Sequence, residues 1–327
     1  MKNWKKAIAV CASAAALVSM TACGGSNSSS GSDSGKKTIG FVAVGPEGGF
    51  RTANENDLKK AFKAAGFNLV YSPTQSNDQQ KQIQAFNKFV NDEVDAIVLS
   101  ATNDSGWDDC LENAAEAEIP VFTVDRNISI KSAAAKKAVV SHIGPSNVWA
   151  GEQAAEFVNK NFPDGANGFI LEGPAGLSVV TDRGQGWKNK AASNIKVLES
   201  QSANWSTDEA KTVTAGLLDK YKSDNPQFIF AQNDEMGLGA AQAVDAAGLK
   251  GKVKIITIDG TKAALQSLVD GDLSYVIEYN PIFGEETANA VKDYLNGKSV
   301  KKDIEIESKT FDAKSAKEAL DAGTRAY

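Results

Sequence analysis

Several apolar runs of this 327-residue sequence are followed by side chains that can bind a small ligand. These are Glu47, Phe50 and Arg51 after residues 39–44, Asp125 and Arg126 after residues 121–124, Asn233 after residues 228–231, and Asp259 after residues 253–258. Carboxylates accept hydrogen bonds, a guanidinium donates them through a planar fork, and an amide does both. The set therefore suits a ligand that carries many hydroxyl groups.

A sugar is such a ligand, because each hydroxyl of its ring is both a donor and an acceptor. Arg126 beside Asp125, with Arg183 and Asn233 opposite them, can pair with neighbouring hydroxyls. The weakly polar C–H faces of a sugar need flat apolar walls. The candidates for those walls are Phe50, Trp107 and Trp205.

Each of these residues also has a purely structural interpretation. Asp125 and Asp259 follow strands and can cap the next turn. Arg51 can be a solvated residue in the first turn of a helix, and Trp107 or Trp205 can belong to a core. The residues alone leave these alternatives open.

The elements that position these side chains follow a strand–helix order. Apolar runs predict strands at residues 39–44, 68–71, 96–99, 121–124, 139–142, 168–171, 195–198, 228–231 and 253–258, with amphipathic helices between them, such as 52–65 and 79–90. Runs without polar alternation indicate strands that are covered on both faces. The order predicts an α/β fold with parallel sheets, and the number of strands predicts two Rossmann-like lobes. In such sheets ligands lie beyond the carboxyl ends of the strands.

The first 22 residues have the pattern of a secretory signal, with Lys2, Lys5 and Lys6 before a short apolar stretch. The signal ends before Cys23, and residues 20–23 resemble the bacterial lipobox, whose cysteine is acylated. An ordinary secretory signal with a chance cysteine is the alternative. Residues 23–37 are rich in serine and glycine and predict a flexible tether. We therefore expect a protein held by lipid on the outer face of the cell membrane.

Charge, cysteine and motif content exclude several classes of function. Loss of residues 1–22 removes three lysines and no acid, which leaves 32 basic and 41 acidic residues and a net charge of −9. This balance gives no basic patch for nucleic acid. With Cys11 removed and Cys23 acylated, Cys110 is left as a small core residue. The single histidine, His142, and the lack of a phosphate-binding loop or a G-x-S-x-G motif predict no enzyme, no cofactor and no metal site.

Four segments resemble the bacterial ribose-binding proteins. They are residues 228–240 (FIFAQNDEMGLGA), 258–261 (IDGT), 124–126 (VDR) and 182–186 (DRGQG). Residues 45–51 (GPEGGFR) are closer to the galactofuranose-type branch. The resemblance extends from about residue 38 to the end of the chain.

The resemblance implies a periplasmic-binding-protein fold of type I, with two lobes that close on a ligand about a three-strand hinge. We expect one lobe in residues 38–142 and 280–310, and the other in residues 143–279 and 311–327. The crossings are expected near residues 141–146, 259–262 and 279–283, and the stretch from about Pro281 is expected to return to the first lobe. An ABC permease with its ATPase is the implied partner, and we expect a monomer.

Carried over residue by residue, the resemblance implies a ligand site. Its residues would be Phe50, Asp125, Arg126, Arg183, Trp205, Asn233 and Asp259. Tyr279 falls where ribose binders have a glutamine. Glu47 and Arg51 follow the galactofuranose-type pattern, which favours a furanose ring with an extra substituent. We expect fructose first, then galactofuranose, ribose or xylose.

Three other functions are considered. A carbohydrate-active enzyme can use acids at strand ends as general acid and base. A sugar-responsive transcription regulator shares the fold but needs an N-terminal helix-turn-helix, and a signal and tether occupy that place here. A signal receptor for a sugar-like autoinducer would bind in the same way and differ only in its partner.

Overall fold

The computed structural model describes residues 35–74, 78–323, 325 and 327. The expected signal at residues 1–22, the lipidation residue Cys23 and the tether as far as residue 34 lie outside the described residues. Within the described part of the chain, no helix combines the length and the apolar character that crossing a membrane requires.

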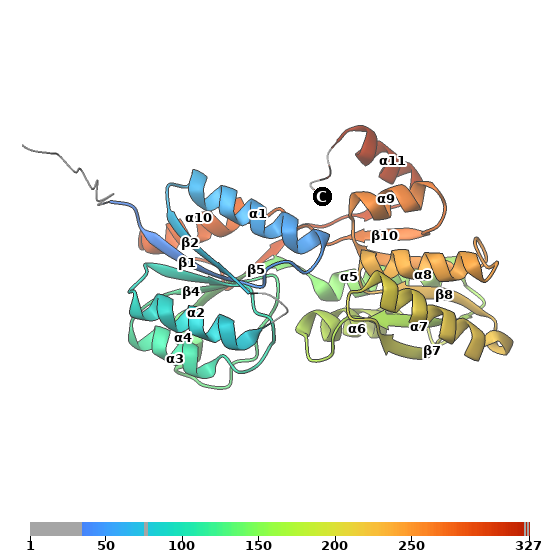
Figure 1. Cartoon of the computed structure of the whole chain (residues 1–327), viewed down its shortest axis with the longest axis horizontal. Coiled ribbons are helices and arrows are strands. Elements are labelled where there is room, and N and C mark those ends of the chain that lie inside the picture. Colours follow the sequence, from blue (N-terminus) through green and yellow to red (C-terminus); the bar gives the residue numbers. More distant parts are fainter. Residues whose placement is uncertain (1–34, 75–77, 324, 326) are drawn as a thin grey trace, which may run out of the picture. The chain divides into compact units, whose positions relative to one another are not determined.

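Two six-stranded sheets form the framework of residues 36–327 (Figure 1). The first sheet has the order β11-β5-β4-β3-β1-β2, and the second has the order β12-β10-β9-β8-β6-β7. The strands of the first are β1 (Thr38–Ala43), β2 (Asn68–Pro73), β3 (Ala96–Leu99), β4 (Val121–Val124), β5 (Val139–Pro145) and β11 (Asp303–Ile306). Those of the second are β6 (Ala166–Glu172), β7 (Ile195–Ser202), β8 (Pro226–Ala231), β9 (Lys254–Asp259), β10 (Tyr275–Glu278) and β12 (Thr310–Phe311). Among the described residues the strand pairs are parallel except β10–β12, so the α/β class with two parallel sheets is confirmed.

Helices cover both faces of each sheet. In the first lobe, α1 (Gly49–Ala64) and α10 (Gly284–Leu295) lie on one face, and α2 (Gln79–Asn91), α3 (Asp108–Glu116) and α4 (Ala135–Ala138) lie on the other (Figure 1). In the second lobe, α5 (Asn147–Asn161) and α6 (Ser178–Lys190) lie on one face. The other face carries α7 (Thr207–Lys220), α8 (Asp234–Ala246), α9 (Lys262–Val269) and α11 (Ala313–Asp321), and a short 3-10 helix spans Lys222–Asp224.

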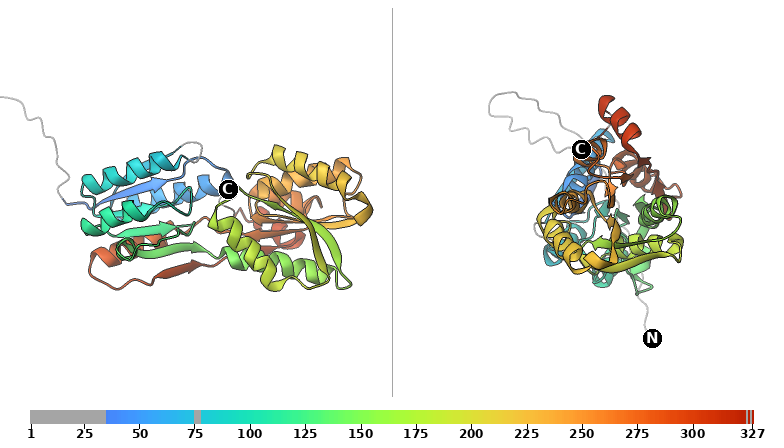
Figure 2. Two further views of the ribbon diagram at one scale, coloured as in Figure 1. Left: turned by 90° about the horizontal axis from the view of Figure 1, so that it is seen from below. Right: turned by 90° about the vertical axis from the view of Figure 1, so that its right-hand side faces the viewer.

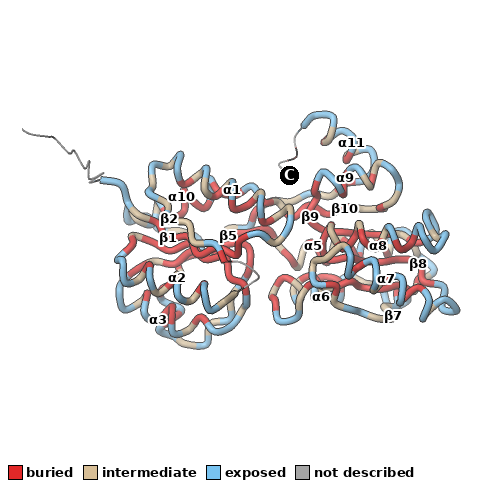
Figure 3. Tube along the Cα trace, in the orientation of Figure 1, coloured by how far each residue is buried: buried red, intermediate tan, exposed pale blue. Residues whose placement is uncertain are grey.

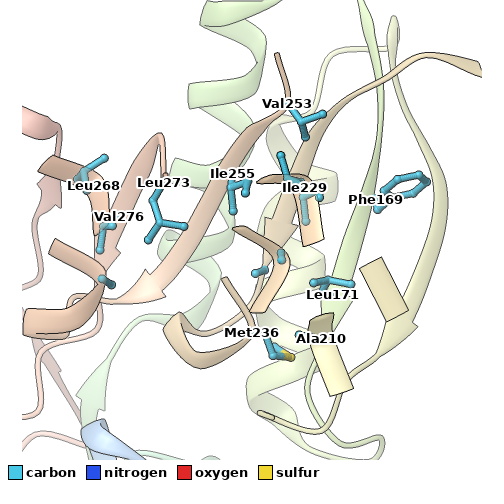
Figure 4. Close-up of a cluster of buried hydrophobic side chains, with 14 of the residues drawn as sticks. Phe169, Leu171, Ala210, Ile229, Met236, Val253, Ile255, Leu268, Leu273 and Val276 are labelled. Carbon is cyan, nitrogen blue, oxygen red and sulfur yellow. The ribbon is translucent and has the colours of Figure 1, made fainter. Parts of the chain in front are cut away.

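The double cover explains why the central strands, such as β3 and β4, are apolar along their whole length. In β1, Phe41 packs with α1 and α10, whereas its neighbour Val42 packs with α2 and α3. In β9, Ile255 and Ile256 likewise belong to the cores on opposite faces. Successive side chains of a strand point to opposite faces, so both must be apolar when both faces are buried. Figure 3 shows the strands as mostly buried, and Figure 4 shows the core on the α7–α8–α9 face.

The chain crosses three times between the two sheets. The crossings are β5 to α5 at residues 145–147, β10 to α10 at residues 278–284, and β11 to β12 at residues 306–310. The crossing expected at residues 259–262 is wrong, because β9 and α9 on either side of it both belong to the second lobe. The expected return after Pro281 is confirmed: α10 and β11 join the first lobe, and segments late in the sequence appear in both lobes (Figure 2).

Candidate functional site

A pocket of about 420 Å³ lies between the two lobes, beyond the carboxyl ends of their strands. This figure includes space that is open to solvent. The lining residues are Glu47, Gly48, Gly49, Phe50, Arg51, Asp125, Arg126, Val179, Arg183, Trp205, Asn233, Glu235, Asp259 and Tyr279. Loops after strands of both sheets, and the helices that follow those loops, supply them, as expected where parallel strands end.

In the first lobe, Arg51 and Asp125 form a buried ion pair. Arg51 stands in the first turn of α1, and Asp125 directly follows β4; each side chain is only 3% exposed. Arg51 Nη2 donates to Asp125 Oδ2, and Arg51 Nη1 donates to Ser100 Oγ over 3.0 Å. Burial alone would raise the pKa of Asp125, but the guanidinium groups of Arg51 and Arg126 hold it below its usual range. Asp125 is therefore an ionised acceptor at neutral pH.

Arg126 is held in place from several sides in the same lobe. Its Nη2 donates to Glu47 Oε2, and its Nη1 donates to the carbonyl oxygens of Ala101 and Thr102, each at 3.3 Å. The Arg126 side chain is 4% exposed. Because its fork is fixed before any ligand arrives, little side-chain freedom is left to lose on binding.

In the second lobe, Arg183 of α6 faces the pocket. Its Nε donates to Asn147 Oδ1 over 2.9 Å, and its Nη1 donates to the carbonyl of Gln232. Its Nη2 lies 3.9 Å from Asp259 Oδ1. Its guanidinium carbon is 4.9 Å from the ring centre of Tyr279, so the cation lies over an aromatic face.

Asp259 belongs to a group of acids in the second lobe. It ends β9, and Asp234 and Glu235 begin α8 beside it. Burial raises the pKa of Asp259 well above its usual range; Arg183 opposes this shift, and Asp234 and Glu235 add to it. Burial also raises the pKa of Asp234 to about 7, although its carboxylate accepts hydrogen bonds from Gly260 N (2.9 Å) and Thr261 N (2.7 Å).

Aromatic rings form the apolar walls of the pocket. Phe50 and Tyr279 have ring centroids 5.1 Å apart, and Trp205 lines the second lobe. The Tyr279 hydroxyl accepts from Asn147 Nδ2 at 3.0 Å and donates to the Asp125 carbonyl at 3.4 Å. These bonds hold the ring as a fixed wall.

Three non-glycine residues of the pocket have a positive φ, which L-residues rarely adopt. The angles are 65° at Asp125, 61° at Trp205 and 130° at Asp259. Such strain costs about 1–3 kcal/mol at each site and clusters where function requires a defined side-chain direction.

Four buried polar atoms on the lining residues have no hydrogen-bond partner within the described part of the protein. They are Glu47 Oε1, Arg51 Nε, Arg126 Nε and Trp205 Nε1. Buried polar atoms almost always have a partner, so we expect hydroxyl groups of a bound ligand to supply partners here. The set contains three donors and one acceptor, which suits a neutral polyhydroxy compound.

Comparison with known proteins assigns the family. The model of the periplasmic binding protein domain matches residues 39–299. The chain belongs to the periplasmic binding protein family. It is 86% identical to the fructose import binding protein FruE of Bifidobacterium longum over the full length of both chains. It is 30% identical to the galactofuranose-binding protein YtfQ of Escherichia coli, over 97% of this chain and 98% of the relative.

A solved structure gives the same fold. The protein from Mycobacterium smegmatis in complex with β-D-fucofuranose is 32% identical and has a TM-score of 0.82, over 88% of this chain and 95% of that one. The type I periplasmic-binding-protein fold expected from the motifs is thereby confirmed.

In this periplasmic binding protein, the ten residues expected to bind the ligand all line the pocket. They are Glu47, Phe50, Arg51, Asp125, Arg126, Arg183, Trp205, Asn233, Asp259 and Tyr279. The wall expected from Trp107 is wrong. Its side chain is 0% exposed, packs on Phe86 in the α2–α3 core, and donates from Nε1 to the Asn103 carbonyl.

Sequence reasoning missed four lining residues of this binding protein, namely Gly48, Gly49, Val179 and Glu235. Glu235 lies two residues after Asn233, and this closeness to the end of a predicted strand could have identified it as a lining residue. Cys110 is a buried thiol whose pKa burial raises to about 11, as suits a core residue. The described residues contain no group of three or more His, Cys, Asp or Glu side chains that could hold a metal ion.

Proposed function

We propose that this protein captures a monosaccharide in its furanose form between its lobes and delivers it to an ABC permease, with fructose as the first candidate. Galactofuranose, ribose and xylose are the other candidates. The observation that carries the proposal is the pocket between the lobes, where fixed guanidinium groups and carboxylates face one another between aromatic walls.

The charge pattern favours a neutral sugar over a sugar phosphate or a sugar acid. Arg51 and Arg126 are already paired with Asp125 and Glu47. A charged ligand would leave one of these buried groups without its partner, which is costly. Hydroxyl groups can use the free donors and acceptor without disturbing the pairs.

The relatives support the same ligand class. FruE is named for fructose, YtfQ for galactofuranose, and the Mycobacterium smegmatis structure contains a furanose. Identity of 86% over the full length to FruE is the reason for placing fructose first.

We propose binding without catalysis. Asp125 is held as a carboxylate by Arg51, so it is poorly suited to act as a general acid. Incubation of the protein with labelled sugars should return them unchanged; a new product would favour the carbohydrate-active enzyme. A receptor for a sugar-like autoinducer is distinguished by its partner, and ATP-driven uptake of fructose by the reconstituted permease would favour transport.

We further propose that a lipid on Cys23 anchors the protein to the outer face of the cell membrane and that the protein is a monomer. Cells fed a labelled fatty acid should label the wild type and the Cys110→Ala variant but not Cys23→Ser. Label in Cys23→Ser would overturn the anchor, and light scattering gives the oligomeric state.

The central test is a thermal-shift screen over pentoses and hexoses, followed by titration calorimetry. A ligand that binds only the folded state raises the unfolding midpoint by mass action. We expect the largest shift with fructose and dissociation constants in the micromolar range, about −8 kcal/mol. Absence of a shift with every monosaccharide would overturn the proposal.

A further inference from the structure

The first residues of α1 have no helix cap of their own. The N-cap is Gly48, which has no side chain to accept a hydrogen bond, and the first turn of the helix carries no acid. The free N–H groups at a helix start favour a nearby negative group. A capping group for α1 must therefore come from elsewhere in the fold.

Glu235 of the second lobe supplies that group. Its Oε1 accepts a hydrogen bond from Gly49 N, the first residue of α1, over 3.2 Å. Its Oε2 accepts from Asn233 Nδ2 over 2.7 Å, and Asn233 is itself fixed as the N-cap of α8. The carboxylate thus reaches across the pocket from one lobe to the other.

Glycine at residues 48 and 49 permits this approach. A Cβ on Gly48 would lie 3.0 Å from Glu235 Oε1, and Gly48 has a φ of 136°. A Cβ on Gly49 would lie 3.4 Å from Thr261 and from Tyr327, both residues of the second lobe. The start of α1 therefore lies close against the second lobe.

A second hydrogen bond joins the lobes at another part of the pocket rim. Ser178 Oγ, at the start of α6, donates to the carbonyl of Asn127 over 3.2 Å. The sequence neighbours of this pair, Val179 and Arg126, line the pocket. Neither this bond nor the one from Gly49 to Glu235 belongs to the three crossing segments.

We propose that Glu235 is a positioning residue that holds the two lobes together by capping α1 across the pocket, and that the Ser178–Asn127 hydrogen bond assists it. The hydrogen bond from Gly49 N to Glu235 is called the latch below. This inference rests on the proposed function, because fastening stabilises the closed form that holds the sugar. A contact that exists only in the closed form shifts the equilibrium towards closure and slows ligand release.

The test compares Glu235→Ala with the wild type for fructose and for sugars that differ from it at one hydroxyl. Hydrogen bonds to charged groups are strong, so loss of the latch should raise the dissociation constant by roughly tenfold. Glu235 lines the pocket, but if its bond to Gly49 acts only by stabilising the closed form, the factor should be the same for every sugar. Stopped-flow fluorescence of Trp205 should place the change in the dissociation rate.

Glu209→Ala is the matched control. Glu209 also stands in the first turn of a helix, α7, and accepts from an asparagine, Asn204 Nδ2, at 2.7 Å, but it does not line the pocket. The Glu209→Ala variant should therefore have the same dissociation constants as the wild type. Ser178→Ala should raise them by a few-fold, as expected for a neutral hydrogen bond.

A factor that differs between sugars would make Glu235 a ligand contact and overturn the proposal. If the wild type binds no sugar, the proposed function fails, and sugar-free X-ray scattering still decides the latch. Glu235→Ala should then show a larger average radius of gyration than the wild type. Identical profiles would overturn the latch.

Discussion

Asp125 and Asp259 are buried carboxylates on opposite sides of the pocket, and their pKa values are shifted in opposite directions. Burial tends to raise both values. Arg51 and Arg126 outweigh burial at Asp125, whereas Arg183 alone, at 3.9 Å, does not do so at Asp259. The pocket therefore pairs an ionised acid in the first lobe with an acid in the second lobe that retains its proton to higher pH.

This asymmetry predicts how the stability of the sugar-free protein depends on pH. An unfolded aspartate titrates near pH 4, and the folded Asp259 titrates at higher pH. The folded state thus holds the extra proton, and this contribution to stability is full below about pH 4 and lost as pH rises through the folded pKa. The Asp259→Asn variant lacks this carboxyl group, so its stability should not fall with rising pH for this reason.

The measurement is the unfolding temperature of Asp259→Asn minus that of the wild type, taken from pH 5 to pH 8. We expect this difference to increase with pH. His142, whose pKa burial lowers, acts with the opposite sign. Asp234, Glu235 and Arg183 act on Asp259, and burial raises the pKa of the neighbouring Tyr327, which stays uncharged in this range; all of these groups are present in both proteins. A difference that does not change with pH would contradict the assignment of Asp259.

Arg126 is predicted to be essential for binding. It is 3% exposed, donates to Glu47, and keeps its Nε free for a ligand. A hydrogen bond to a charged group is worth about 1.5–3 kcal/mol, so loss of the Arg126 donor in Arg126→Ala should weaken fructose binding by at least about tenfold. Arg126→Lys keeps the charge but not the planar fork, so its affinity for fructose should lie between those of the wild type and Arg126→Ala. Calorimetry that finds native affinity in Arg126→Ala would remove Arg126 from the site.

The strand ends could be predicted from the sequence because their signal is local. A doubly covered strand must be apolar along its whole length, as in residues 96–99 and 121–124, and the polar residue that follows marks its end. Parallel strands then bring these ends to one edge of each sheet. This is why side chains as far apart in sequence as Asp125 and Asp259 could be assigned to one pocket.

The features that were missed depend on long-range geometry. Strands β10, β11 and β12 are short or partly exposed, so they lack a continuous apolar run, and the third crossing at residues 306–310 was missed with them. Trp107 lies at the start of α3, and the sequence does not show which way that helix start faces. The contact between Glu235 and Gly49 joins two lobes, so nothing in the local sequence of either residue indicates it.

Glu47 is predicted to set the choice between fructose and ribose. Glu47 lines the pocket; its Oε2 accepts from Arg126, while its Oε1 is buried without a hydrogen-bond partner among the described residues. Glu47→Ala should lower the affinity for fructose more than the affinity for ribose. The ratio of the two affinities should fall roughly tenfold, as expected for the loss of one charged hydrogen bond. Glu47→Gln keeps a carbonyl acceptor and should retain more of the ratio. Equal losses for both sugars in calorimetry would show that Glu47 only supports Arg126.

Gly173 is predicted to determine the position of Trp205. A Cβ on Gly173 would lie 2.1 Å from Trp205 Cζ2, so Gly173→Ala must displace the indole from the pocket wall. Loss of this aromatic wall should weaken sugar binding by about tenfold and shift the emission of the sugar-free protein. Gly184→Ala is the matched control, because a Cβ there meets no atom within 4 Å, and it should bind like the wild type. Unchanged affinity in Gly173→Ala would mean that Trp205 is not a wall of the sugar site.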